Sequence, residues 1–137
     1  MIVTIQSTGD IAHASSPHTA EVTKVLGVNI SAVNLESATQ RILEWIAASA
    51  REYVAVTGVH GVVEAQEDPA LKKIFNEAGM AVPDGMPMVW LSKRAGRTDV
   101  SRVFGPDLML EVCAALAQRG GRTRLAARPI GIATRRR

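Results

Sequence analysis

The sequence is poor in cysteine, with Cys113 the single thiol among its 137 residues. One cysteine cannot form an intrachain disulfide, which excludes a disulfide scaffold. Cys113 lies in the apolar helical run 108–116, where a buried thiol has an ordinary packing role. No segment approaches the roughly 18 consecutive apolar residues of a membrane span, and residues 1–20 lack the basic start and apolar block of a signal peptide. These absences predict a globular protein located in the cytoplasm.

Several motifs that bind nucleotides or metals, or that carry catalysis, are also missing. The sequence contains no GxxxxGK[ST] phosphate-binding loop, no GxGxxG, no GxSxG and no HExxH. It contains no Asp-x-Asp pair, so the carboxylate grip on Mg²⁺ of many nucleotide-sugar enzymes is not visible. We therefore predict no metal and no cofactor.

Positive charge is scarce outside the C-terminal end of the chain, although the net charge is +3. Residues 119–137 contain seven arginines and no acid, which leaves nine Lys and Arg against thirteen Asp and Glu in residues 1–118. The main part of the chain is therefore acidic, and we predict no nucleic-acid partner for it. A separate hypothesis is that the arginine-rich tail binds nucleic acid or anionic lipid, with an affinity that falls as salt rises.

We expect three regions along the chain. Residues 1–21 show no helical or strand period and predict a poorly ordered leader. Residues 22–121 predict one domain, because 47% hydrophobic residues can bury a sizeable core. In residues 122–137 the apolar run is cut by arginines and a proline where another strand is due. That composition fits either a chain that ends within its fold, through a frameshift or early stop, or a true basic tail.

Residues 22–121 alternate between strand and helix patterns. An extended element and turn over residues 25–34 precede an amphipathic helix over residues 35–50. A strand over residues 52–57 then runs into a loop at 58–61, and a short strand over residues 80–82 ends at Pro83-Asp84-Gly85. Helices are predicted from Asp68-Pro69 to Gly79, from Pro87 towards Gly96, and from Gly105 to Gly120. This order predicts a layered α/β fold with a largely parallel sheet, whose functional groups gather at the carboxyl ends of the strands.

Asp84 and Arg102 are the principal candidates for chemistry. A carboxylate held between a proline and a glycine at a strand end has free lone pairs for a general base, although Asp-Gly is also a common turn pair. Arg102 precedes Gly105-Pro106 and could hold a diphosphate through bidentate hydrogen bonds. Its alternative role is a surface arginine, or one that pairs with Asp99 or Asp107.

Thr57 and His60 lie at the predicted end of the strand over residues 52–57. A hydroxyl and an imidazole in this position could hydrogen-bond a sugar or a phosphate, and His60 is a rival base because imidazole titrates near neutral pH. A purely structural hydrogen-bonding role is the alternative for each.

Four blocks together resemble the bacterial WecG/TagA/CpsF glycosyltransferase family over residues 22–120. They are Val-Thr-Gly-Val-His-Gly-Val-Val-Glu-Ala at 56–65, Asp68-Pro69, Val-Pro-Asp-Gly-Met-Pro at 82–87 and Ser-Arg-Val-Phe-Gly-Pro-Asp-Leu at 101–108. The resemblance implies a Rossmann-like fold and an inverting, metal-independent transfer. It further implies the transfer of N-acetylmannosamine from its UDP donor to a polyprenyl-diphosphate-linked N-acetylglucosamine. Such a transfer builds teichoic-acid linkers and surface polysaccharides.

By the same resemblance, Asp84 is the base that deprotonates the acceptor hydroxyl and Arg102 holds phosphate. Thr57 matches the threonine of the family's Thr-x-Asn, whereas His60 departs from that pattern. Family members continue well beyond Gly121, so we expect little or no activity from this chain alone. Self-association and peripheral contact with the inner face of the cytoplasmic membrane are further implications. A catalytically silent α/β module that binds a phosphate-bearing ligand or a partner subunit remains the alternative.

Overall fold

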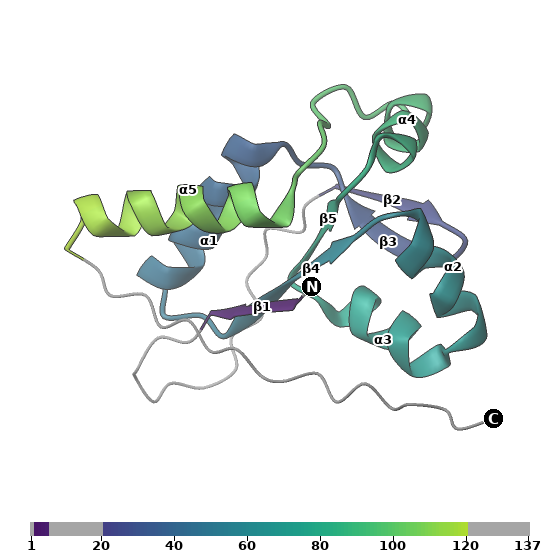
Figure 1. Ribbon diagram of the computed structural model, residues 1–137, viewed down its shortest axis with the longest axis horizontal. Helices are drawn as coiled ribbons and strands as arrows, with labels where there is room; N and C mark the ends of the chain where they lie inside the picture. Colours follow the sequence, from purple (N-terminus) through teal and green to yellow (C-terminus); the bar gives the residue numbers. More distant parts are fainter. Residues whose placement is uncertain (1, 6–20, 121–137) are drawn as a thin grey trace.

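The computed structural model describes residues 2–5 and 21–120, and they form a mixed α/β fold (Figure 1). The helices and strands alternate along most of this part of the chain. In chain order they are β1 Ile2–Ile5, β2 Val22–Val25, β3 Val28–Ser31, α1 Leu35–Ala47, β4 Glu52–Thr57, α2 Val59–Glu67, α3 Pro69–Glu77, β5 Met80–Pro83, α4 Met86–Arg94 and α5 Gly105–Gln118.

The sheet is built around β4 and β5, which run parallel with Val54 opposite Met80 and Thr57 opposite Pro83. On the other side of β4 lies β1, which is antiparallel to it. Strands β2 and β3 form an antiparallel hairpin beside β5. The predicted α/β class is confirmed, and within the described residues the parallel part of the sheet is the β4–β5 pair.

Strand β1 was not predicted. Residues 2–5 lie within the segment 1–21 for which no strand pattern was recognised, yet they pair with β4 from Ile2 opposite Ala55 to Ile5 opposite Glu52. The four residues Ile-Val-Thr-Ile are all β-branched, which favours a strand even though the run is short. Met1 and residues 6–20 of that segment, together with the tail at 122–137, lie outside the described residues.

The two faces of β4 and β5 carry side chains of different size. Because successive strand residues point to opposite faces, the large residues Val54, Met80 and Val82 share one face, whereas Ala55 and Ala81 share the other. Helices α1 and α5 cover the first face and lie side by side on the left of Figure 1. The β2–β3 hairpin, α2, α3 and α4 contribute to the core on the second face, whose members are Val28, Ile30, Ala55, Val62, Ala65, Phe75, Ala81 and Met88.

Most predicted elements are present, and the differences have local causes. The strand at 52–57 and the helix that opens at Asp68-Pro69 are confirmed, and the Asp68 side chain accepts hydrogen bonds from two backbone N–H groups of the first turn. The loop predicted at 58–61 was wrong, because α2 begins at Val59 directly after the strand. The extended element expected over residues 25–30 is a tight hairpin, with Leu26 and Gly27 at positive φ in its turn.

Candidate functional site

Asp84 stands at the carboxyl edge of the sheet, immediately after β5. Its backbone N–H donates to the Thr57 carbonyl at 2.9 Å, which ties the ends of the two parallel strands together. The Arg102 guanidinium lies beside its carboxylate, with Nε 3.3 Å from Oδ1. Two residues that are 18 positions apart in the sequence are thus brought into contact.

The backbone on either side of Arg102 is held by hydrogen bonds to the core. Ser101 N–H donates to the Val33 carbonyl at 3.3 Å, and Val103 N–H donates to the Pro83 carbonyl at 2.9 Å. Val103 is completely buried, whereas Arg102 is exposed. These two hydrogen bonds fix the backbone on both sides of Arg102, and the Arg102 side chain is exposed at the carboxyl edge of the sheet.

Phe104 adds a second contact to the Arg102 side chain. The guanidinium carbon lies 5.1 Å from the centroid of the Phe104 ring, within the range of a cation–π contact. The phenyl ring is itself 41% exposed. One face of the guanidinium is thereby engaged while its remaining N–H donors are left for other groups.

The Asp84–Arg102 ion pair is open to water, with the two side chains 29% and 51% exposed. Pairs of this kind contribute no more than about 1 kcal/mol to stability. The Arg102 side chain can therefore exchange Asp84 for a more highly charged anion at little cost. In that state the Asp84 oxygens become available to a hydroxyl group.

Gly58 is a site residue that the sequence analysis treated only as a turn glycine. A Cβ at this position would lie 2.4 Å from the Asp84 carbonyl oxygen, which is closer than any side chain can stand. The absence of a side chain therefore lets the start of α2 approach the Asp84 backbone. No local signal distinguishes this requirement from an ordinary turn, because the contact is with a residue 26 positions away.

The helices that begin at this edge differ from the other two in how they start. No side chain caps α2, α4 or α5, whose N-cap residues are Gly58, Gly85 and Phe104. By contrast, α1 and α3 are capped by the side chains of Asn34 and Asp68. Uncapped first-turn N–H groups and the positive end of the helix dipole both favour anions. The edge around Asp84 and Arg102 is therefore suited to phosphate groups.

Thr57 and His60 occupy different environments at this edge. Thr57 is only 3% exposed, and its hydroxyl donates to the Gly58 carbonyl at 3.4 Å. Its contact with Asp84 runs through the backbone carbonyl instead. His60 is exposed in the first turn of α2 rather than in the predicted loop. Of the four predicted site residues, Asp84, Arg102 and Thr57 are joined by hydrogen bonds within the described part of the chain.

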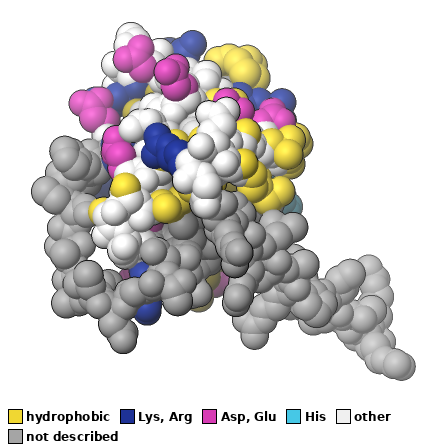
Figure 2. Space-filling model, turned by 90° about the vertical axis from the view of Figure 1, so that its left-hand side faces the viewer, with side chains coloured by type: hydrophobic (Ala, Val, Ile, Leu, Met, Phe, Trp, Pro, Cys, Tyr) yellow, Lys and Arg dark blue, Asp and Glu magenta, His cyan; other side chains and the backbone are white. Residues whose placement is uncertain are grey.

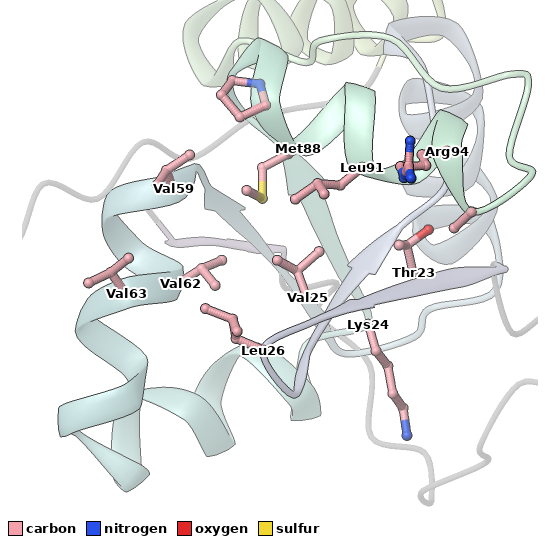
Figure 3. A pocket seen from close by; sticks show the side chains of 12 residues that line it. Thr23, Lys24, Val25, Leu26, Val59, Val62, Val63, Met88, Leu91 and Arg94 are labelled. Atoms are coloured by element: carbon pink, nitrogen blue, oxygen red, sulfur yellow. The ribbon is translucent and has the colours of Figure 1, made fainter.

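An apolar groove of about 650 Å³ lies next to this edge. Figure 3 shows Val59, Val62 and Val63 of α2 on one side and Met88 and Leu91 of α4 on the other, with the β2–β3 turn closing it below. Val59, Val63 and Leu91 in its lining are exposed, so the large hydrophobic residues of this region are not all hidden in the core. Figure 2 faces the other side of the molecule, that of α1 and α5, and shows charged side chains interspersed with hydrophobic ones.

Within residues 2–5 and 21–120, no three His, Cys, Asp or Glu side chains are grouped closely enough to hold a metal ion. In the same residues, no helix combines the length and apolar character needed to cross a bilayer.

The chain matches a known protein family, whereas comparison with curated proteins gives no match. The matching family model, described as the glycosyl transferase WecG/TagA/CpsF family, covers residues 23–134. The match includes helices α1 to α5, strands β3 to β5, all but the first residue of β2, and the Asp84–Arg102 edge, whereas β1 lies outside it. It extends past residue 120, where the resemblance in the sequence analysis ended. The chain belongs to the WecG/TagA/CpsF family of glycosyl transferases.

Proposed function

We propose that this chain transfers a hexosamine, N-acetylmannosamine or a close relative, from a UDP-sugar to an acceptor sugar linked to polyprenyl diphosphate. The product belongs to surface-polysaccharide or teichoic-acid-type biosynthesis. Membership of the glycosyl transferase family supports the reaction class. The observation that carries the proposal is the Asp84–Arg102 contact of 3.3 Å, at an edge where three helices begin without side-chain caps.

In this proposal Asp84 is the general base of an inverting, metal-independent transfer. Its carboxylate takes the proton of the acceptor hydroxyl, and the acceptor oxygen forms a bond to the anomeric carbon of the donor. The bond from that carbon to UDP breaks, and the electron pair leaves on the UDP diphosphate. A positioned base of this kind accelerates a reaction by about 10²- to 10⁴-fold.

Arg102 is proposed to hold a diphosphate of one of the two substrates. A diphosphate carries more charge than a single carboxylate, so it competes with Asp84 for the guanidinium. Binding would then free the Asp84 oxygens at the moment when the acceptor hydroxyl arrives. The exposure of the ion pair supports this exchange, because both side chains are reachable from solvent.

Thr57 and His60 take supporting roles in the proposal. Thr57 positions Asp84 through its carbonyl, which accepts the Asp84 N–H at 2.9 Å. His60 is exposed at the start of α2, where its imidazole could contact a sugar or phosphate. Because a polyprenyl-linked acceptor resides in a membrane, the reaction takes place at the inner face of the cytoplasmic membrane, with the chain in peripheral contact.

The proposal is tested with the full 137-residue chain. Calorimetry measures UDP binding, and product formation is followed with UDP-N-acetylmannosamine and a short-chain lipid-diphosphate acceptor, with protein in excess so that low turnover is detectable. Asp84→Asn is expected to lower the rate by about 10²- to 10⁴-fold without weakening UDP binding. Asp99→Asn changes another exposed aspartate and is the matched control.

The same experiment separates catalysis from simple binding. A non-catalytic phosphate-binding module would lose affinity with Arg102→Ala and be unaffected by Asp84→Asn. Turnover that survives Asp84→Asn would remove the base assignment. Low turnover by the unmodified chain would agree with the small activity expected of this chain alone, whereas the absence of UDP binding as well as turnover would remove the proposal as a whole.

A further inference from the structure

We infer that the apolar groove between α2, α4 and the β2–β3 hairpin binds the isoprenoid chain of the lipid-linked acceptor. The inference rests on the proposed function, because it assigns a place to the part of that substrate which Asp84 and Arg102 do not touch. The groove measures about 650 Å³, within the usual range of ligand sites. Its walls are mainly valine, leucine, methionine and proline, and no acidic residue lines it among those described.

The groove begins where the catalytic edge ends. Val59 directly follows Gly58, and Pro87 lies three residues after Asp84, and both line the groove. From Pro87 the groove follows α4 to Arg94 and Ala95, a length of about 12 Å at 1.5 Å per helical residue. A ligand with its sugar and diphosphate at Asp84 and Arg102 can thus lay an attached apolar chain along α4.

Leu26 gives the most specific sign that the groove has an occupant. Leu26 and Gly27 form the two-residue turn between Val25 and Val28, with φ values of 50° and 79°. Turns in which both central residues have positive φ favour Asn, Asp or Gly, and a leucine there is strained. Leu26 is also 63% exposed.

The direction of the Leu26 side chain also agrees with an occupied groove. Figure 3 shows Leu26 pointing from the hairpin turn towards Val62 at the mouth of the groove. An apolar side chain therefore stands where both backbone geometry and water contact favour a polar one. Contact with an apolar ligand compensates for both costs.

The far end of the groove is basic. Arg94 is exposed there, and Figure 3 shows it at the opposite end from Val59 and Val63, whereas the exposed Lys24 side chain points away from the groove. Cationic side chains near the exit of an apolar chain favour the phosphate headgroups of an anionic membrane. This polarity matches a lipid whose head lies at Asp84 and whose tail continues into a bilayer, and it does not favour a peptide.

The test measures how affinity depends on chain length. Calorimetry compares dimethylallyl, geranyl and farnesyl diphosphate on the full chain and its variants. Each fully buried methylene can raise affinity by up to about fourfold. Since the groove is open on one side, we expect a total rise of at least about tenfold from dimethylallyl to farnesyl diphosphate.

Leu26→Asn separates binding from folding. Asparagine suits the turn better than leucine, so the melting temperature should stay the same or rise, while the gain between dimethylallyl and farnesyl diphosphate should shrink at least about threefold. Val63→Asn, on the opposite wall, should shrink the same gain. Leu110→Asn is the matched control, because Leu110 is 67% exposed on α5 and does not line the groove.

Several results would overturn the inference. They are equal affinity for the three diphosphates, an unchanged chain-length gain in Leu26→Asn, and a chain-length gain lost equally in Leu110→Asn. A lower molecular mass of Leu26→Asn in sedimentation would make the groove an interface between copies. If Leu26→Asn lost binding to phosphatidylcholine vesicles while the unmodified chain showed no chain-length gain, the groove would be a contact with the bilayer. Arg102→Ala should weaken all three ligands alike, and if it does not, the proposed diphosphate contact fails while the chain-length gain still decides the groove.

Discussion

The two faces of the β4–β5 pair are built from the same two strands and yet have different roles. On one face, Val54, Met80 and Val82 pack against α1 and α5 in a closed core. On the other face the equivalent positions are Ala55 and Ala81. Small side chains there let the hairpin come close, and the Ser31 hydroxyl accepts the Ala81 N–H at 3.1 Å.

This difference separates stability from function within one small domain. The closed face buries large side chains under two of the longer helices. The alanine face has shorter helices over it, and α2 and α4 border the apolar groove. Asp84 and Arg102 lie at the carboxyl edge where the two faces meet. We therefore expect substitutions on the first face to affect folding alone, and those on the second to affect folding and ligand binding together.

A pair of methionines tests this separation with the largest expected effects. Met80 lies on the closed face and Met88 lines the groove, and they are 1% and 2% exposed. Truncation of a buried methionine to alanine costs about 2–5 kcal/mol of unfolding free energy. We expect both variants to be destabilised in urea unfolding, with Met80→Ala the more so because its cavity is closed.

Only Met88→Ala should also weaken farnesyl diphosphate, because it removes part of the groove wall. The comparison between the faces would break if Met80→Ala lowered ligand affinity as much as Met88→Ala while the protein remained folded. It would also break if Met88→Ala bound farnesyl diphosphate as tightly as the unmodified chain.

Gly58→Ala tests the edge itself and should cost about 1–3 kcal/mol, as other overpacked sites do. Its Cβ would lie 2.4 Å from the Asp84 carbonyl oxygen, which is backbone and cannot turn away. Gly61→Ala is the matched control in the same helix, because its Cβ would meet the Thr57 hydroxyl, a side-chain atom, at 2.5 Å. We expect Gly58→Ala to lose more UDP binding and more stability than Gly61→Ala. Equal losses would mean that the approach of α2 to Asp84 is not specifically required.

The sequence predicted the elements whose signals are local. Asp68-Pro69 marks a helix start by chemistry within one turn, and the Asp68 side chain caps α3 as expected. Gly105-Pro106 likewise opens α5. Asp84 was predicted at a strand end and Arg102 just before the helix that opens at Gly105-Pro106, and the structure brings the two side chains into contact. The roles of these two residues remain proposals.

The missed features depend on contacts between distant residues. The start of α2 was read as a loop because Gly58 and Gly61 look like turn glycines, whereas the Asp84 backbone and the Thr57 side chain explain them. Strand β1 needed a partner in β4 that four terminal residues do not reveal. The groove could not be foreseen, since its lining comes from a hairpin and two helices that meet only in the folded chain.

Tyr53→Phe sharpens the comparison with a smaller effect on the alanine face. The Tyr53 hydroxyl donates to the Ile74 carbonyl of α3 at 2.6 Å, and loss of this bond should cost about 0.5–1.5 kcal/mol. Burial, together with the charges of Glu77 and Glu52, raises the pKa of Tyr53 above its ordinary value of 10.0.

The raised pKa gives this contribution a defined pH dependence. The folded chain keeps the phenol proton at pH values where the unfolded chain loses it, so the stabilisation is complete below about pH 10 and disappears as pH rises through the folded pKa. The free energy of unfolding of the unmodified chain, measured in urea, should therefore fall in the alkaline range. This fall should be smaller in Tyr53→Phe. An identical alkaline decline in both proteins would assign it to other groups.

Phe104→Leu is expected to have the smallest effect, at the edge between the two faces. The ring contacts the Arg102 guanidinium at 5.1 Å, and an exposed cation–π contact of about 0.5–1 kcal/mol corresponds to a two- to fivefold loss of diphosphate affinity. Phe104→Tyr should restore it. The start of α5 should survive, because the Phe104 backbone carbonyl, not its ring, accepts the Leu108 N–H. If the ring acts by holding Arg102, Phe104→Leu will have no further effect in the Arg102→Ala background, whereas independent losses that add would show that the ring contacts the ligand directly.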